Sequence, residues 1–219
     1  MKKVIFMAAL CALTLPALSQ PFQTKSLSGT NIREVYAETS GGNLLIEGAG
    51  ESEVRVEMYV WPGNDRNKKM TKEEVEKRLA EQYDLTITTD DHQLKVIAKR
   101  KPLANRMRNS MGVSFRMYVP SSVNSELRTS GGNVAVKALS GGKQRLMTSG
   151  GSIAAKDIQG NLHAGTSGGN VALSGLRCSV NASTSGGNMD VTVIKLVDHV
   201  TLNNSGGNTV LKLPENAAV

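Results

Sequence analysis

Thr166-Ser167-Gly168-Gly169-Asn170-Val171-Ala172-Leu173 contains the phrase that decides the fold of this chain. Its first five residues return, sometimes with one substitution, at sites that begin at Thr39, Thr129, Thr148, Thr184 and Asn204. From Gly131 onward, the first glycines of successive copies are 19, 18, 18 and 20 residues apart. This period is too short for repeats built from helix pairs and fits units of two or three short strands joined by tight turns. The chain is therefore predicted to be a repeat protein that offers a long, regular surface instead of a catalytic pocket.

Aligning the copies on their glycines places apolar residues in shared columns. The position directly after the motif holds Leu44, Val134, Ile153, Val171, Met189 and Thr209. Two residues further on stand Ile46, Val136, Ala155, Leu173, Val191 and Leu211, and a third column, further along, holds Leu139, Ile158, Leu176 and Ile194. Apolar residues also alternate before each motif, for example Val180 and Ala182. Period-two alternation on both sides of a Gly-Gly turn predicts half-buried strands.

These columns favour an all-β fold, a parallel β-solenoid in which each repeat of about 18–20 residues makes one coil. Successive coils would stack about 4.8 Å apart, so that the apolar columns merge into one core. Each glycine pair is expected to supply positive φ angles and room for close backbone approach at a corner. The Thr and Asn side chains of the motif are expected to stack in ladders between coils. The corner residues are Gly41, Gly42, Asn43, Gly131, Gly132, Asn133, Gly150, Gly151, Gly168, Gly169, Asn170, Gly186, Gly187, Asn188, Gly206, Gly207 and Asn208.

Two other β architectures are the structural alternatives. A β-propeller repeats at about 40 residues per blade, which counts against it. A sandwich with irregular hairpins is the other alternative.

Residues 48–128 interrupt the pattern and form a predicted strand-rich insert. Strands are expected at residues 54–60, 85–89, 94–98 and 113–119, with a turn at residues 61–64. Thr71 followed by Glu74 is a capping box, which predicts one short helix over about residues 71–83. We expect this insert to cover the N-terminal end of the solenoid, because an uncovered stack offers an open edge for aggregation. Regular coils are expected over residues 129–213.

The last residues echo an earlier segment. Residues 213–219, Leu-Pro-Glu-Asn-Ala-Ala-Val, resemble residues 119–123, Val-Pro-Ser-Ser-Val, which precede another strand and another motif. The final coil is therefore predicted to be uncapped, completed by a partner, or truncated in this sequence.

Residues 1–20 have the pattern of a secretory signal peptide. Lys2 and Lys3 form a positive n-region, residues 4–15 an apolar h-region, and residues 16–19 a small-residue exit. The apolar run is shorter than the roughly 20 residues that a membrane anchor needs. Lipoprotein attachment through Cys11 is the competing interpretation, but Leu10 stands where a small residue should precede the modified cysteine. The sequence thus predicts one exported domain, residues 21–219, in the periplasm, on the outer-membrane surface or outside the cell.

Composition agrees with a small exported β-rich domain. About 200 residues suffice to bury a core without disulfide bonds. Cys178 is the one cysteine outside the signal peptide, so no internal disulfide is expected, and Cys178 is predicted to be a small side chain at a coil position and not a reactive thiol. Without Lys2 and Lys3 the chain has 24 basic and 19 acidic residues, a net charge of +5. This mild excess is compatible with anionic glycans or membrane surfaces and requires neither.

The recurrent Ser-Gly-Gly-Asn-(apolar)-x-(apolar) phrase, the Val/Leu-Pro segments before a new coil and the signal peptide resemble the bacterial putative-adhesin family, an exported family of β-strand repeat proteins of unknown function. The resemblance covers nearly the whole of residues 21–219. It implies a β-solenoid and a location in the cell envelope or on the surface of a Gram-negative bacterium. It implies no binding residues, and this chain differs from the pattern in its abrupt ending.

A glycan-active β-helix enzyme, a lyase or hydrolase, is an alternative, because polysaccharide-cleaving enzymes also use parallel β-helices. Such a site needs paired carboxylates or acidic metal ligands on one face. The acids of the repeats share no aligned column one coil apart, and the histidines lack metal-ligand spacing. Those residues are Glu126, Asp157, Asp190, Asp198, Glu215, His92, His163 and His199. The glycines match neither a phosphate loop nor a calcium-binding nonapeptide repeat, so no enzyme, cofactor or metal is predicted.

One local concentration of positive charge is a candidate contact for lipopolysaccharide phosphate or an acidic glycan. It consists of Lys99, Arg100, Lys101, Arg106 and Arg108. A solvated loop between two strands is the alternative interpretation. Export argues against a nucleic-acid partner, and the aromatic content of 4% argues against a cleft lined with sugar-stacking rings.

We therefore expect a non-enzymatic, exported cell-envelope or surface protein, an adhesin that presents a repetitive solenoid face. Its expected partners are glycans, envelope components or host surface proteins. The alternative is an envelope scaffold or assembly module that self-associates by stacking through an open C-terminal coil.

Overall fold

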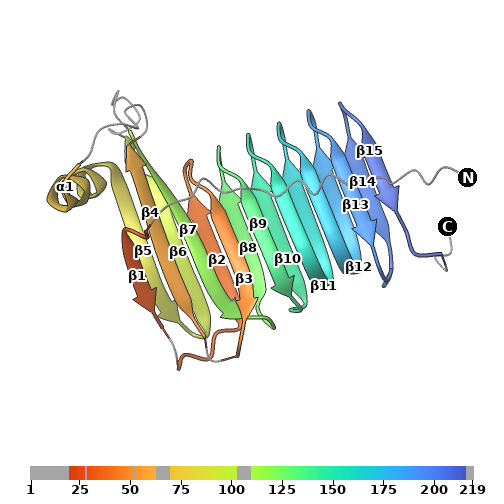
Figure 1. Cartoon of the computed structure of the whole chain (residues 1–219), viewed down its shortest axis with the longest axis horizontal. Coiled ribbons are helices and arrows are strands. Elements are labelled where there is room, and N and C mark those ends of the chain that lie inside the picture. Colours follow the sequence, from red (N-terminus) through yellow and green to blue (C-terminus); the bar gives the residue numbers. More distant parts are fainter. Residues whose placement is uncertain (1–19, 28, 52, 63–69, 103–109, 216–219) are drawn as a thin grey trace, which may run out of the picture.

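The computed structural model describes residues 20–27, 29–51, 53–62, 70–102 and 110–215. Within these ranges the chain is mostly β, and its fifteen strands form a mixed parallel and antiparallel sheet with one helix at one end (Figure 1). The elements are β1 (Gln23–Ser26), β2 (Glu34–Thr39), β3 (Leu44–Ala49), β4 (Arg55–Pro62), α1 (Lys72–Gln82), β5 (Tyr83–Asp90), β6 (Gln93–Arg100), β7 (Met111–Pro120), β8 (Asn124–Thr129), β9 (Val134–Leu139), β10 (Lys143–Thr148), β11 (Ile153–Thr166), β12 (Val171–Thr184), β13 (Met189–Val193), β14 (Val200–Asn204) and β15 (Thr209–Lys212).

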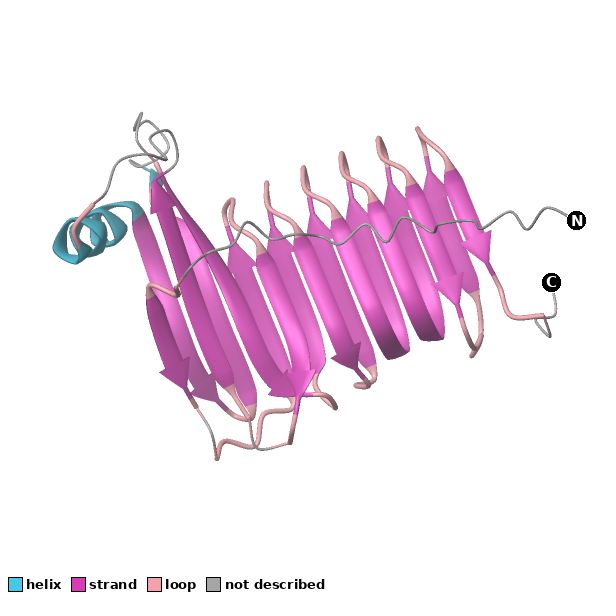
Figure 2. Cartoon of the chain, viewed as in Figure 1, coloured by secondary structure: helices cyan, strands magenta, loops and turns pink. Residues whose placement is uncertain are grey.

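The sheet curls so that its strands lie in two layers around one apolar core (Figure 2). Layer A contains, in hydrogen-bonded order, β1, β4, β7, β3, β9, the first halves of β11 and β12, β13 and β15. Layer B contains β5, β6, β2, β8, β10, the second halves of β11 and β12, and β14. Each Ser-Gly-Gly motif connects a strand of layer B to the next strand of layer A, because the glycine pair lets the backbone reverse in a short corner.

The predicted columns after the motif are confirmed pair by pair. Val134 pairs with Ile153, Ile153 with Val171, and Val171 with Met189, all in parallel register. The second column is equally regular, since Ala155 pairs with both Val136 and Leu173. These side chains are buried, so the alternation read from the sequence marks the core-facing side of each strand.

The third predicted column is wrong at its last member. Leu139, Ile158 and Leu176 are buried, whereas Ile194 is 47% exposed. The register between β12 and β13 shifts after Leu173, so that Leu176 pairs with Val193, which is buried in place of Ile194. β12 has two residues between these two pairs and β13 has one, so β13 is one residue shorter at this point.

The insert forms the end of the molecule drawn at the left of Figure 1, which we call the capped end. Its strands β6 and β7 pair in parallel with β2 and β3 and so extend the two layers. Beyond them, β5 and β4 run antiparallel to β6 and β7, and the four-residue β1 adds to β4. All four expected strands of the insert are found as β4, β5, β6 and β7.

The helix of the capped end begins where the capping box predicted it. The Thr71 hydroxyl accepts a hydrogen bond from the backbone N–H of Glu74, and the Glu74 carboxylate accepts one from the N–H of Thr71. The expected turn at residues 61–64 is wrong at its first half, because Trp61 and Pro62 belong to β4 and pair with Gly112 and Met111 of β7. The second half of that turn lies outside the described residues.

The opposite end, formed by β14 and β15 and drawn at the right of Figure 1, we call the open end. β14 pairs with β12 and β15 with β13, and neither pairs with a further strand within the described part of the chain. Leu211 of β15 occupies a core-facing column and is nevertheless 40% exposed. The apolar core is therefore uncovered at this end of the described residues.

The described part of the chain contains no helix that is both long and apolar enough to cross a bilayer. The predicted signal peptide lies almost entirely in residues 1–19, which fall outside the described ranges. The prediction of a parallel β-solenoid, which is finer than the mixed two-layer sheet described above, stays a prediction.

Candidate functional site

The second glycine of each motif packs against the preceding corner. A Cβ atom added to Gly132 would lie 1.9 Å from the carbonyl oxygen of Gly42, and one added to Gly151 would lie 1.9 Å from that of Gly132. The same approach recurs at Gly169 and Gly187. The first glycine of the pair has more room, since the nearest atom to a Cβ on Gly150 would be 3.7 Å away. A side chain is therefore excluded by the neighbouring backbone at the second glycine and not at the first.

The expectation of positive φ angles at these glycines is wrong for all copies but the last. Among the motif glycines only Gly207 has a positive φ, of 89°. Close approach between corners, and not a left-handed backbone, is therefore the reason for glycine in the interior copies.

The motif threonines form a ladder of side-chain hydrogen bonds between corners. The Thr148 hydroxyl donates to the carbonyl oxygen of Gly132 (2.8 Å) and accepts from the N–H of Gly151 (3.2 Å). Thr129 makes the same pair of contacts, donating to the carbonyl oxygen of Gly42. The ladder continues through Thr39, Thr166, Thr184 and Asn204.

The last residue of the motif forms a second ladder. The backbone N–H of Asn133 donates to Oδ1 of Asn43 (2.8 Å), and the N–H of Asn188 donates to Oδ1 of Asn170 (2.8 Å). The remaining rungs involve Ser114, Ser152 and Asn208. Since both ladders use the polar groups of the corners to hold neighbouring repeats together, the predicted corner residues have an architectural role, and binding chemistry must be sought on the outward faces.

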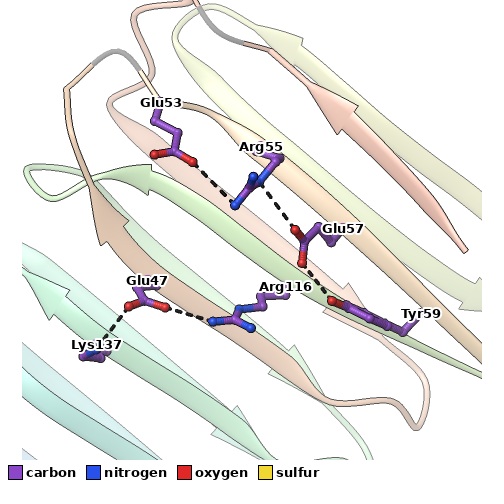
Figure 3. A network of polar contacts seen from close by, with 7 residues as sticks. All are labelled: Glu47, Glu53, Arg55, Glu57, Tyr59, Arg116 and Lys137. Carbon is purple, nitrogen blue, oxygen red and sulfur yellow. Dashed lines mark hydrogen bonds and ion pairs between the residues drawn. The ribbon is translucent and has the colours of Figure 1, made fainter. Parts of the chain in front are cut away.

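An ion-pair network covers the outer side of layer A at the capped end (Figure 3). Arg55 lies between Glu53 (3.6 Å) and Glu57 (3.5 Å), and the Tyr59 hydroxyl donates to Glu57 (2.8 Å). These residues come from β4 and the segment before it, and they alternate with the buried Val54, Val56 and Met58. The alternation that builds the core thus also places the charges on one outer face.

The same network reaches the first regular repeat. Glu47 of β3 accepts hydrogen bonds from Arg116 (3.2 Å) and Lys137 (3.1 Å), which lie on the strands at either side (Figure 3). The ring of Tyr118 lies under two guanidinium groups, 4.2 Å from Arg55 and 4.9 Å from Arg116. The network therefore joins the insert to the repeats across four neighbouring strands, β4, β7, β3 and β9.

Hydrogen bonds from neighbouring cations favour the charged form of Glu47 on this face. Burial alone would raise the pKa of Glu47, but hydrogen bonds from Lys137 and Arg116 outweigh it and hold that pKa below its ordinary value. Burial and the hydrogen bond to Glu57 raise the pKa of Tyr59 to about 12, so this hydroxyl stays a donor at neutral pH. The face presents fixed charges and ring surface, an arrangement suited to binding and not to proton transfer near neutral pH.

A shallow polar groove of about 210 Å³ lies on the outer side of layer B. The Tyr36 hydroxyl donates to Glu38 (2.6 Å), and this bond is the main reason why the pKa of Tyr36 is raised to about 12. Glu126 accepts from Arg128 (2.8 Å) and lies 3.6 Å from Arg145. The polar residues that line the groove are Glu34, Tyr36, Gln93, Asn124, Glu126, Lys143 and Arg145.

The basic segment predicted as an anion contact is partly engaged within the capped end. Arg100 donates to the hydroxyl of Tyr83 (3.1 Å) and to the carbonyl oxygen of Met111 (3.2 Å). Lys101 donates to the carbonyl oxygen of Ala80 at the end of α1 (2.7 Å). Lys99 is exposed on β6, while Arg106 and Arg108 lie outside the described residues. Arg100 therefore links strands of the capped end, Lys101 bonds to the helix, and the anion contact stays a prediction.

The acids and histidines weighed for an enzyme are spread over the fold. Asp157 lies in β11 at positive φ, Asp190 is exposed on β13, and Asp198 pairs with its neighbour His199 (2.8 Å). His163 faces outward beside Arg145, and its pKa is lowered by burial and by Arg145 and Lys143. The described residues contain no group of three His, Cys, Asp or Glu side chains placed to hold a metal ion.

Sequence reasoning did not identify either outer face as a site. The residues of the ion-pair network lie far apart in the chain, and only the register of β4, β7, β3 and β9 brings them together. The available signal was the charged alternation in residues 53–59, where every second residue is ionisable or aromatic.

No protein-family model and no curated protein matches the chain. The resemblance to the putative-adhesin family therefore rests on the motifs alone.

Several solved structures are similar to the chain at low identity. A "putative cell adhesion protein" from Clostridium sporogenes is 10% identical, with a TM-score of 0.45 over 88% of this chain and 98% of its own. A "putative adhesin" from Bacteroides fragilis is 12% identical, with a TM-score of 0.34 over 88% and 96%. A "putative lipid binding protein" from Parabacteroides distasonis is 13% identical, with a TM-score of 0.33 over 87% and 97%. Likeness at these TM-scores leaves the function to be argued from the residues.

Proposed function

We propose that the chain is a parallel β-solenoid and that the protein is an exported, non-enzymatic surface or envelope protein that binds an extended polar partner along its outer faces. Matched parallel registers in both layers support the solenoid, because each repeat contributes one strand segment to layer A and one to layer B. The two ladders at the corners have the same repeat, which supports a stack of equivalent coils.

The observation that carries the binding proposal is a continuous outer row of polar side chains on layer B. Tyr36 pairs with Glu126, Glu126 with Arg145, and Arg145 with His163 in parallel register. The row extends through Lys95, Asn181 and Thr201. Neighbouring strands are about 4.8 Å apart, so the row presents hydrogen-bonding groups at short, regular intervals.

Such a row suits a glycan more closely than it suits a compact ligand. A glycan presents hydroxyl groups along an extended chain, and carboxylate and guanidinium groups bind hydroxyls through charge-assisted hydrogen bonds. The groove beside Tyr36 and Arg145 lies in this row and is lined mainly by polar groups. An adhesin that binds glycans of the envelope or of a host surface is the function that these features support best.

The experiment is a binding screen of the purified protein against host glycans, matrix proteins and envelope components. Variants Arg145→Ala and Glu126→Ala are expected to weaken glycan binding by about tenfold, because each removes a charged hydrogen-bonding group from the row. Lys156→Ala removes an exposed charge from the outer side of layer A and serves as the control. Equal losses in all three variants would point to nonspecific charge effects and would contradict the proposal.

Export and the lack of an enzymatic role are tested separately. Cell fractionation should find the protein outside the cytoplasm with residues 1–20 removed, as mass spectrometry of the N-terminus would show. Acidic polysaccharides should stay intact when incubated with the protein. Turnover that disappears in Asp157→Ala or Asp190→Ala would replace the adhesin by a glycan-active enzyme.

A second candidate is assembly through the open end. β14 and β15 offer backbone groups along their outer edges, and Val210, Leu211 and Val197 expose apolar surface beside them. Exposed edges of this kind favour pairing with another sheet. Sedimentation velocity over a range of concentrations should then reveal self-association that Val210→Lys abolishes. A protein that stays monomeric at high concentration would exclude this candidate.

A further inference from the structure

A cavity of about 450 Å³ opens at the capped end, at the opposite end of the sheet from the open end. Its apolar wall combines both layers and the helix: Phe22 precedes β1, Met58 belongs to β4, Leu79 and Ala80 to α1, and Tyr83 and Leu85 to β5. Pockets for small organic ligands are commonly 300–1,000 Å³ and mostly apolar. We call this hollow the cap cavity.

The cavity exists because the last strands of the two layers differ in length. β1 has four residues and pairs with β4 only from Arg55 to Met58, whereas β4 continues to Pro62. The helix covers part of the remaining edge. On one side Lys25 of β1 donates to the carbonyl oxygen of Ile87 of β5 (2.7 Å), which ties the two edge strands together. Beside this hydrogen bond, the space between β1, β5 and α1 forms the cavity.

Leu85 shows that the cavity reaches the apolar core. It pairs with Ala98 of β6, which is fully buried, and it therefore points toward the core side of layer B. Nevertheless 39% of Leu85 is exposed. Because this leucine faces the core and is still exposed, it lines an apolar opening in contact with water. Water against apolar surface is unfavourable, so an apolar ligand that displaced this water would bind favourably.

The charged groups that line the cavity both lie on α1, while Gln23 of β1 adds a neutral polar group. Lys72 and Glu76, one helical turn apart on α1, line the cavity and form an ion pair with N–O distance 4.0 Å. Both side chains are more than half exposed, so they can turn toward a ligand without losing buried contacts. A cation and an anion side by side complement a head group that carries one charge of each sign.

We propose that the cap cavity binds the alkyl chain of a single-chain amphiphile whose zwitterionic head group is held at Lys72 and Glu76. The chain lies against Leu85, Leu79 and Phe22, and the head group stays at the solvent-exposed first turns of α1. This site is separate from the glycan row on layer B, so each can be present without the other.

The test uses dodecylphosphocholine below its micelle-forming concentration, with binding followed by calorimetry and by displacement of cis-parinaric acid. Leu85→Asp is expected to weaken binding by about tenfold or more, because it places a charge in the path of the alkyl chain. Leu211→Asp is the matched control, since Leu211 is a core-facing leucine of nearly the same exposure, 40%, at the open end. Equal losses in the two variants, or a loss in Leu211→Asp alone, would overturn the proposal.

A second variant keeps the test decisive if Leu85→Asp is poorly folded. Ala80 is exposed on α1 and lines the cavity, so Ala80→Phe fills the hollow from the helix side without altering the core. We expect Ala80→Phe to bind dodecylphosphocholine about tenfold more weakly at an unchanged melting temperature. Undiminished binding by folded Ala80→Phe would place the amphiphile elsewhere and overturn the proposal.

Separate variants and ligands test whether Lys72 and Glu76 hold the head group. Lys72→Glu should weaken dodecylphosphocholine binding, and the double variant Lys72→Glu/Glu76→Lys should restore it, because the exchanged pair still offers both charges. Dodecanoate and dodecyltrimethylammonium should bind more weakly than the zwitterion. If all three head groups bind equally, the assignment of the head group to Lys72 and Glu76 is wrong.

Discussion

The capped end and the open end finish the same stack of strands in different ways. At the capped end β1, β4 and β5 run antiparallel to their neighbours, α1 lies beside them, and a hydrogen bond from Lys25 joins β1 to β5. At the open end β14 and β15 are parallel to their neighbours, and no described segment covers them. Both ends expose a core-facing leucine, Leu85 or Leu211. The difference teaches that a repeating ladder does not specify its own ends, so each end needs sequence that departs from the repeat.

The largest expected effect concerns two glycines of one corner in the interior of the stack, away from either end. Gly151→Ala should destabilise the fold by more than about 4 kcal/mol, because the new methyl group would meet the backbone carbonyl of Gly132, which cannot move without shifting a whole corner. Gly150→Ala should cost about 1 kcal/mol or less. Urea denaturation measures both. Similar free energies of unfolding for the two variants would mean that the corners separate more easily than their contacts indicate.

A next smaller effect compares two leucines of one column. Leu173→Ala creates a cavity in the buried core and should cost about 3 kcal/mol, whereas Leu211→Ala should cost less than about 1 kcal/mol because Leu211 is already partly in water. Guanidinium denaturation at low protein concentration gives both values. A cost at Leu211 as large as at Leu173 would show that the open end is covered in solution.

At the capped end, a smaller effect is expected from removing the side-chain hydrogen bond at the N-terminus of α1. Thr71→Ala loses the side-chain acceptor for the N–H of Glu74 and should destabilise the protein by about 1 kcal/mol. Since the helix lies at one end, hydrogen exchange should quicken in α1 and stay unchanged in β12. Lys72→Ala, on the same exposed turn, is the control. Uniformly faster exchange would mean that the helix and the repeats unfold as one unit.

The smallest effect concerns a side chain that lies away from both ends. Cys178 is buried, and burial raises the pKa of its thiol to about 11, so little thiolate is present near pH 8. A thiol reagent should therefore label native protein much more slowly than unfolded protein. Because the raised pKa favours the protonated thiol in the folded state, stability should fall as pH rises from about 9 to 11, and less so in Cys178→Ala. Fast labelling at pH 8 would mean that β12 opens readily.

The repeats could be predicted from the sequence to the level of residue pairs. Period-two alternation and the glycine spacing gave the columns through Val134, Ile153 and Val171, because a regular parallel stack repeats one local pattern. The register shift at Val193 could not be predicted, since it depends on how β13 pairs with β12.

The candidate sites were beyond sequence reasoning for a physical reason. The network around Glu47 needs β7 beside β3, and these strands are far apart in the chain. The cap cavity depends on β1 being shorter than β4, and no local sequence pattern predicts that difference in length. The glycine corners and their close backbone approach were predicted, but the positive φ angles expected there are found only at Gly207.

The asparagine ladder has a consequence for how such a gene can change. The rung between Asn133 and Asn43 is made in the same way as that between Asn188 and Asn170, so neither rung depends on its position in the series. An in-frame duplication of the 18-residue unit 153–170 would therefore create new rungs identical to the old ones. Each such event would lengthen the molecule by about 4.8 Å and leave both ends untouched. Length is thus a trait that this lineage can vary by unequal recombination, independently of whatever its two ends have been selected to do.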